Sequence, residues 1–139
     1  MREVESWYCR IEASIFMKHP LQKRVITIFI VSVWIVNGQF CKILDLVPRH
    51  RLIVARILGE NHASMLTVCI GVAELGMALW IVSRKMKRLN AWVQITVVLV
   101  MNVLEFLLAS DLLLWGRGNL VFAILFALLI YYNEFCLVD

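Results

Sequence analysis

The chain has 139 residues, of which 62% are hydrophobic and 17% are charged, and its formal net charge is +4. Soluble domains average about 45–50% apolar and about 25% charged residues, so this composition argues against a soluble fold and favours one membrane-embedded domain. The basic residues stand in short clusters beside apolar runs, which is typical of membrane orientation signals and argues against nucleic-acid binding.

Residues 1–24 form a polar leader of mixed charge, ahead of a membrane domain that we expect over residues 25–139. Trp7, Ile11 and Ile15 recur at intervals of four residues, so a short amphipathic helix on the membrane surface is one interpretation of the leader. A cytoplasmic leader without regular structure is the other, and both stay open. No small-residue cleavage site follows the first apolar run, so we interpret that run as a retained helix.

Four apolar segments approach the length of about 20 helical residues that a hydrocarbon core of ~30 Å requires. They cover residues 25–44, 65–82, 91–109 and 112–132. An open sheet edge is forbidden in lipid and four spans are too few for a barrel, so the spans are predicted to be helices. The expected fold class is therefore all-α, a membrane-embedded antiparallel four-helix bundle.

The connection between the first two spans contains more than a simple loop. Pro48 can occupy the first turn of a helix, and Gly59 can follow the last turn. Arg49 and Arg56 are seven residues apart and therefore share one helix face. We expect a short interfacial helix here that caps the bundle.

The distribution of Lys and Arg predicts the orientation of the bundle. Five of the 14 lie in the leader, four lie between the second and third spans, and the remaining five lie on the opposite side. The positive-inside rule then places both termini in the cytoplasm.

Polar side chains gather toward the outer ends of the predicted spans, whereas the inner halves hold little besides Gln94. A charge at the bilayer centre costs about 2.5–3.5 kcal/mol, so Glu74 and Glu105 need partners or protons, and Lys42 is one available cation. We predict an outward-facing polar pocket beneath the interfacial helix. Its candidate residues are Asn37, Lys42, Arg49, His50, Arg56, Glu74, Asn102, Glu105, Asp111 and Asn119.

Helical spacing places these polar groups on inward faces. Thr67, Gly71, Glu74 and Ala78 form one stripe of small residues around a carboxyl group, and small residues let membrane helices approach closely. Buried Asn and Glu can also serve only to join helices, through hydrogen bonds that average roughly 0.6 kcal/mol. Two carboxyls, a lysine and an Arg-His-Arg run at one depth favour a functional pocket.

The cysteines give no sign of a metal or redox centre. Cys9, Cys41, Cys69 and Cys136 form no Cys-x-x-Cys pair, and their spacing fits neither a zinc site nor a disulfide framework. No haem, flavin or iron–sulfur motif and no self-contained catalytic motif is evident, so whether the chain is an enzyme stays open and no metal is expected. A redox role would need a partner subunit or a quinone.

Several short motifs occur together in a pattern found in one known family. They are residues 37–42 (NGQFCK), 46–50 (LVPRH), 53–59 (IVARILG), 111–116 (DLLLWG), Gly71 with Glu74, and Asn102 with Glu105. Over about residues 25–135 the chain resembles the DoxX-like family of bacterial four-helix membrane proteins. The resemblance implies a multi-pass protein of the bacterial cytoplasmic (inner) membrane. The family members after which the family is named belong to a thiosulfate:quinone oxidoreductase. Other members act together with oxidative-stress enzymes or as assembly factors.

Three functions remain open at this stage. The first is an accessory or redox-associated subunit that binds a small lipophilic ligand such as a quinone, with Glu74, Asn102 and Glu105 as hydrogen-bonding groups. The second is a structural or assembly protein without a ligand. The third is a proton-coupled transporter, which requires a continuous polar path. The expected partners are the lipid bilayer and a partner protein subunit.

Overall fold

The computed structural model describes residues 20–113 and 115–137, and these contain helices and no strands. Four helices are long and apolar enough to cross a membrane: Pro20–Ile43, Glu60–Ser83, Lys87–Leu108 and Gly118–Cys136. The predicted all-α fold class is confirmed. The amphipathic interpretation of the leader concerns residues that lie outside the described part, except that residues 20–24 are helical and belong to the first span.

Two of the four spans change helix type along their length. The first is α-helical over residues 20–35 and continues as the π-helix η1 (Val36–Ile43). The last consists of α5 (Gly118–Tyr131) and the π-helix η4 (Tyr132–Cys136). The remaining elements are α2 (Arg49–Leu58), η2 (Glu60–His62), α3 (Ala63–Ser83), α4 (Lys87–Leu108) and η3 (Ser110–Leu112).

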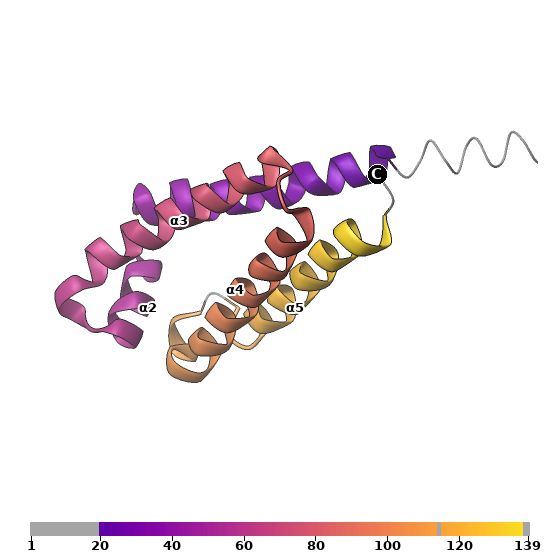
Figure 1. The fold of residues 1–139 in the computed structure, drawn as a ribbon. Helices are drawn as coiled ribbons and strands as arrows, with labels where there is room; N and C mark the ends of the chain where they lie inside the picture. The colour runs from indigo at the N-terminus through magenta and orange to yellow at the C-terminus, as the bar shows by residue number, and fades with distance from the viewer. Residues whose placement is uncertain (1–19, 114, 138–139) are drawn as a thin grey trace, which may run out of the picture.

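The spans associate as two antiparallel pairs. The first span lies along α3 and α4 lies along α5 (Figure 1), and these pairs make the most extensive contacts between elements. A core of Ile30, Trp34, Ala78, Ala91 and Ile130 joins the two pairs. The bundle has two ends: the α2 end, and the turn end, where residues 84–86 connect α3 to α4.

Two glycines determine how closely the first span approaches α3. A Cβ atom built on Gly38 would lie 2.7 Å from the carbonyl oxygen of Gly71, and one on Gly71 would lie 2.8 Å from that of Gly38. Real Cβ atoms do not approach so closely, so only glycine fits at both positions. The predicted stripe of small residues does face the bundle, because Thr67, Gly71 and Ala78 are all buried. Close backbone contact here brings η1 and the middle of α3 together.

The helix α2 is the predicted cap between the first two spans. It follows Pro48 and ends at Gly59, whose φ of 97° is accessible to glycine and strained for other residues. Its Ile53 packs with Ala109 and Leu113 from the connection between α4 and α5. Since α2 contacts both α3 and α4, it bridges the two helix pairs at their shared end.

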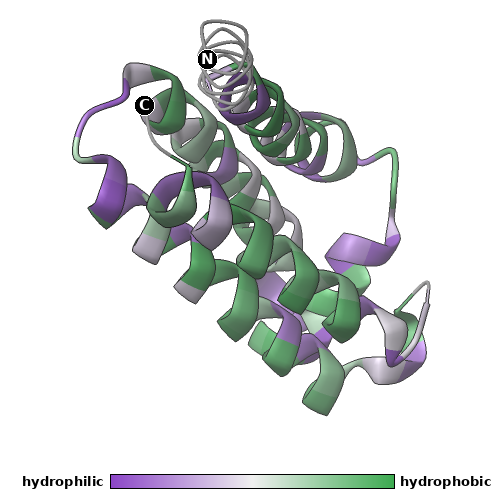
Figure 2. Ribbon diagram, turned by 90° about the vertical axis from the view of Figure 1, so that its right-hand side faces the viewer, coloured by the Kyte–Doolittle hydropathy of each residue, from purple (hydrophilic) through white to green (hydrophobic). Residues whose placement is uncertain are grey.

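The exterior of the bundle is apolar along every span. Large hydrophobic side chains such as Ile28, Leu79, Leu107 and Leu128 are more than half exposed. Hydrophobic residues dominate the middle of the helices, while hydrophilic residues concentrate toward their ends (Figure 2). Soluble proteins do not expose so much contiguous apolar surface, so this exterior faces lipid.

The fourth span begins later than its apolar sequence suggests. We expected a helix from Leu112, but Leu113 is extended, residues 115–117 form a turn and the helix begins at Gly118. Leu113 is 8% exposed and packs on Ile53 of α2, so its hydrophobicity serves a protein contact instead of a lipid contact. Gly116, with φ of 51°, then redirects the chain into α5.

Candidate functional site

A cavity of about 300 Å³ lies at the α2 end, between the two helix pairs. All four spans and α2 contribute to its wall. Its polar lining residues are Asn37, Lys42, His50, Glu74, Asn102, Glu105 and Asn119. Its apolar lining residues are Val33, Trp34, Val97, Val98, Met101, Phe122, Ala123 and Phe126. The cavity thus combines a polar cluster with an aliphatic and aromatic wall.

The charged centre of this site is an ion pair between the first span and α3. Lys42 donates a hydrogen bond from its Nζ atom to Oε1 of Glu74, and the two side chains are only 10% and 13% exposed. The backbone contact at the two glycines explains the pairing, since a Cβ on Gly71 would lie 3.1 Å from Cβ of Lys42. The pair lets both charges remain within the span, because each offsets the desolvation of the other.

Several polar groups around the cavity have no partner within the described part of the chain. Oε2 of Glu74 and Nδ1 of His50 are buried and make no hydrogen bond there. The side chains of Asn37, Glu105 and Asn119 line the cavity and make none with described residues either. Buried polar groups are nearly always hydrogen-bonded, so this cavity requires water or a ligand as its missing partner.

The amide of Asn102 is oriented by its own helix. Its Nδ2 donates to the backbone carbonyl of Val98 at 2.8 Å. That bond uses one of the two amide N–H donors and leaves the side-chain carbonyl oxygen of Asn102 as an acceptor at the cavity. The site therefore offers acceptors from Asn102 and the carboxylates, together with donors from Lys42 and the other amides.

His50 is the one cavity residue that comes from α2. Burial lowers the pKa of its imidazole, and the positive charges of Lys42 and Arg49 lower that pKa further. The nearby Val47 backbone acts in the opposite direction and raises this pKa. His50 is therefore neutral near pH 7 and can both donate and accept a hydrogen bond.

Three of the residues we predicted for the pocket lie outside it. Arg56 and Asp111 are exposed and pair with each other, with oxygen–nitrogen distances of 3.3 and 3.4 Å. Their pairing links α2 to η3 on the outer surface. Each charge there has both an oppositely charged partner and contact with solvent. Arg49 begins α2 next to His50 and does not line the cavity. Its influence on the site is electrostatic.

Sequence reasoning missed the aromatic floor of the cavity. Trp34 is 5% exposed, and its indole nitrogen donates to Oε1 of Gln94 at 2.8 Å. The amide of Gln94 donates in turn to Oδ1 of Asn90 at 2.6 Å. Trp34 precedes Asn37 by three residues and so shares its helix face, which was the available signal.

The half of the bundle away from α2 buries polar side chains that flank the predicted spans, in addition to Gln94 within them. Lys23, Asn90, Gln94 and Asn133 are all buried there, and Thr27 accepts a hydrogen bond from the Asn133 amide. In sequence these residues lie near span ends, where they look like interfacial residues. Antiparallel pairing buries them against one another.

A bundle of four apolar, membrane-length helices, closed at one end by a short helix, defines a multi-pass integral membrane protein. The model of the DoxX-like family matches residues 31–132, and the chain belongs to that family. Comparison with curated proteins finds no match, and neither does comparison with solved structures. Among the residues that the structure describes, no group of three or more His, Cys, Asp or Glu is placed to hold a metal ion.

Proposed function

We propose that this protein is an accessory or redox-associated membrane subunit that binds a small lipophilic ligand of the quinone class in the cavity at the α2 end. One observation carries the proposal. Seven polar side chains from all four spans and α2 line one cavity of about 300 Å³, and several of their groups have no hydrogen-bond partner among the described residues. Intramembrane polar clusters of this kind are functional by default.

The chemistry of the lining suits a carbonyl-bearing ring. Phe122 and Phe126 offer aromatic surface for a flat apolar body, and the volume lies at the lower end for small-molecule sites. Carbonyl oxygens of a quinone accept hydrogen bonds from Lys42 or a side-chain amide. The hydroxyls of the reduced form donate to Glu105 or to the free oxygen of Glu74. Both redox forms thus find complementary groups.

The same proposal includes the setting of the protein. Residues 25–139 form the membrane domain, residues 1–24 are a cytoplasmic leader, and both termini face the cytoplasm of a bacterium whose inner membrane holds the bundle. The excess of Lys and Arg at the turn end supports this orientation. Electrons for a bound quinone would come from a partner subunit.

Binding of a short-chain quinone analogue to the protein in nanodiscs tests the proposal. Glu105→Gln is the informative variant, because it replaces a carboxyl group at the cavity with an amide and leaves the Lys42–Glu74 pair intact. A buried ligand donor that loses its acceptor costs about 1–3 kcal/mol, so the dissociation constant should rise about 5- to 150-fold. The control is Glu60→Gln, an exposed carboxyl outside the cavity. Equal affinity for the quinone analogue in the wild-type protein and both variants would mean that the polar cluster at the cavity has a structural role only.

A proton-coupled transporter is the second candidate. A second cavity lies on the other side of the Trp34–Gln94 hydrogen bond, lined by Gln94, Asn90 and Lys23, so polar groups occur along more of the bundle than the sequence suggested. Proton flux into proteoliposomes should then increase in Trp34→Ala and vanish in Glu105→Gln. Flux indistinguishable from empty liposomes in all variants removes this candidate.

A further inference from the structure

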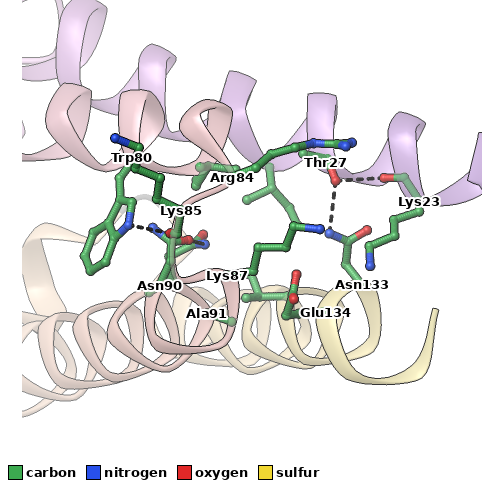
Figure 3. A pocket seen from close by; sticks show the side chains of 14 residues that line it. Lys23, Thr27, Trp80, Arg84, Lys85, Lys87, Asn90, Ala91, Asn133 and Glu134 are labelled. Carbon is green, nitrogen blue, oxygen red and sulfur yellow. Dashed lines mark hydrogen bonds between the residues drawn. The ribbon is translucent and has the colours of Figure 1, made fainter. Parts of the chain in front are cut away.

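The turn end of the bundle contains a cleft that the proposed ligand cavity does not use. Its wall comes from the first span, the turn after α3, the start of α4 and η4 (Figure 3). The enclosed part measures about 50 Å³ and adjoins an open groove of about 760 Å³ with which it shares Lys23, Arg84, Lys87 and Glu134. Together they form what we call the basic cleft.

The charge of the basic cleft is strongly one-sided. Among the described residues, its basic lining residues are Lys23, Arg84, Lys85, Lys87 and Arg88, and its one acidic lining residue is Glu134. Arg84, Lys85 and Arg88 are exposed and make no ion pair with any described carboxylate. The cleft also includes the N-terminus of the 22-residue helix α4, where the helix dipole is positive. Such a site attracts an anion.

A buried amide in the same cleft indicates that the anionic ligand also carries a hydrogen-bond donor. Asn133 is 7% exposed, and its Nδ2 donates to Oγ1 of Thr27 at 3.1 Å. The Thr27 hydroxyl donates to the backbone oxygen of Lys23 at 2.8 Å, so it can only accept from Asn133, and this fixes the amide orientation. Oδ1 of Asn133 is left buried without a hydrogen-bond partner among the described residues. It needs a donor, which a fully ionised phosphodiester group does not itself provide.

The position of the cleft at the ends of the spans suits the depth of lipid headgroups. Trp92, Tyr131 and Phe135 form an aromatic cluster beside it, with Tyr131 and Phe135 stacked at 4.9 Å between ring centroids. Phe135 also lines the groove. Aromatic clusters at span ends mark the membrane–water interface, and basic pockets between helices at that level bind anionic headgroups.

We propose that the basic cleft binds the phosphodiester headgroup of an anionic phospholipid whose head alcohol donates a hydrogen bond to Asn133. The phosphate meets Arg84, Lys85 and Arg88 near the start of α4. The acyl chains follow the apolar exterior of the neighbouring spans. Free inorganic phosphate shares the anionic chemistry but has neither the head alcohol nor the apolar chains. A binding experiment can therefore distinguish a lipid headgroup from free phosphate as the ligand.

Native mass spectrometry of the detergent-solubilised protein tests this site with three probes: phosphatidylglycerol, phosphatidylcholine and inorganic phosphate. Phosphatidylglycerol should bind at least about tenfold more tightly than phosphatidylcholine. The double variant Arg84→Gln/Arg88→Gln should lose most of that preference, since both side chains are exposed and their loss spares the core. The charge-matched control is Arg51→Gln/Arg117→Gln at the α2 end, which should keep the preference.

Replacement of the buried amide separates the two parts of the ligand. Asn133→Ala should weaken the binding of phosphatidylglycerol while leaving the binding of phosphatidylmethanol, a phosphodiester that lacks a head alcohol, nearly unchanged. Inorganic phosphate at millimolar concentration should not displace phosphatidylglycerol. A preference that survives in Arg84→Gln/Arg88→Gln, or displacement of the lipid by phosphate alone, would overturn the proposal.

Discussion

At the scale of single residues, the Lys42–Glu74 pair is the feature on which the cavity depends. Both side chains are nearly buried, and one oxygen of Glu74 still lacks a hydrogen-bond partner among the described residues. A buried pair of this kind gives little net stability, yet losing one member leaves an uncompensated charge. The pair therefore restricts which substitutions the site tolerates.

Substitution of one or both partners should separate these effects. Lys42→Met leaves Glu74 without its cation and should lower the free energy of unfolding by about 3–5 kcal/mol. The double variant Lys42→Met/Glu74→Leu removes both charges and should lose less than that single variant. Reversible unfolding in mixed micelles measures both values. A double variant that loses at least as much stability as Lys42→Met would show that the two side chains do not interact as the structure places them.

His50 gives the site a dependence on pH. Its pKa is lowered from the ordinary value of about 6.5, so the folded protein takes up this proton only at a lower pH than the unfolded chain does. The unfolded state therefore binds more protons just below about pH 6.5, and the free energy of unfolding falls as the pH decreases, until the folded pKa is passed. Lys42, Arg49, Glu74 and Glu105 are the other charged groups near it.

The variant His50→Gln isolates this contribution, because it retains a polar side chain of similar reach. Between about pH 7.5 and about pH 5.5, the wild-type protein should lose more stability than the variant, with the difference appearing below about pH 6.5. Thermal unfolding in detergent at a series of pH values provides the comparison. Parallel curves for the two proteins would show that His50 is as solvated in the folded state as in the unfolded state.

At the scale of helices, the contact of η1 with α3 depends on glycine at two positions and tolerates other residues nearby. The chain provides its own control, because Gly71 meets the backbone of Gly38 whereas nothing lies within 4 Å of a Cβ built on Gly76. The two glycines lie five residues apart in α3. A comparison of the same substitution at Gly71 and Gly76 therefore separates the effect of packing on stability from the effect of intrinsic helix propensity.

Alanine at the two positions should have opposite effects on stability. Gly71→Ala places a methyl group 2.8 Å from a backbone oxygen and 2.9 Å from Cγ1 of Ile43, and should destabilise by about 1–3 kcal/mol. Gly76→Ala should stabilise by about 0.5–1 kcal/mol, because alanine loses less backbone entropy in a helix. Unfolding free energies of both variants give the answer. Equal effects would mean that the first span does not approach α3 so closely.

The lengths of the apolar runs made the four spans predictable, because a bilayer requires a minimum number of apolar residues in each helix. The start of the last span was not predictable, since Leu113 is as apolar as a lipid-facing residue but packs against α2. The π-helical form of η1 also has no clear sequence signal. Local hydrophobicity does not distinguish contact with lipid from contact with protein.

The candidate site shows the same limit at the level of side chains. Depth along the spans brought Glu74, Asn102 and Glu105 to one cavity, because antiparallel helices align residues at equal depth. Depth alone could not show that Arg56 and Asp111 pair on the outer surface instead. It also could not show that Trp34 closes the cavity through Gln94, since a tryptophan in a span equally suits lipid contact.

At the scale of the whole molecule, the bundle has two chemically different ends. The cavity at the α2 end carries carboxylates, amides and one lysine, whereas the basic cleft at the turn end carries five cations and one carboxylate. The apolar core around Ile30 and Ile130 and the Trp34–Gln94 hydrogen bond lie between them. A one-sided excess of Lys and Arg is what orients a multi-pass protein during insertion, with the basic side kept in the cytoplasm.

Accessibility of single cysteines tests that orientation directly. Ser83 is exposed at the turn end and Ser110 is exposed at the α2 end, so cysteine at either position would be reachable from only one side of the membrane. In a background without the native cysteines, a membrane-impermeant maleimide added to intact cells should label Ser110→Cys and spare Ser83→Cys until the cells are lysed. The reverse pattern would place the basic cleft outside. The carboxylate cavity would then open toward the cytoplasm, and any ligand reaching it from the aqueous side would have to come from there.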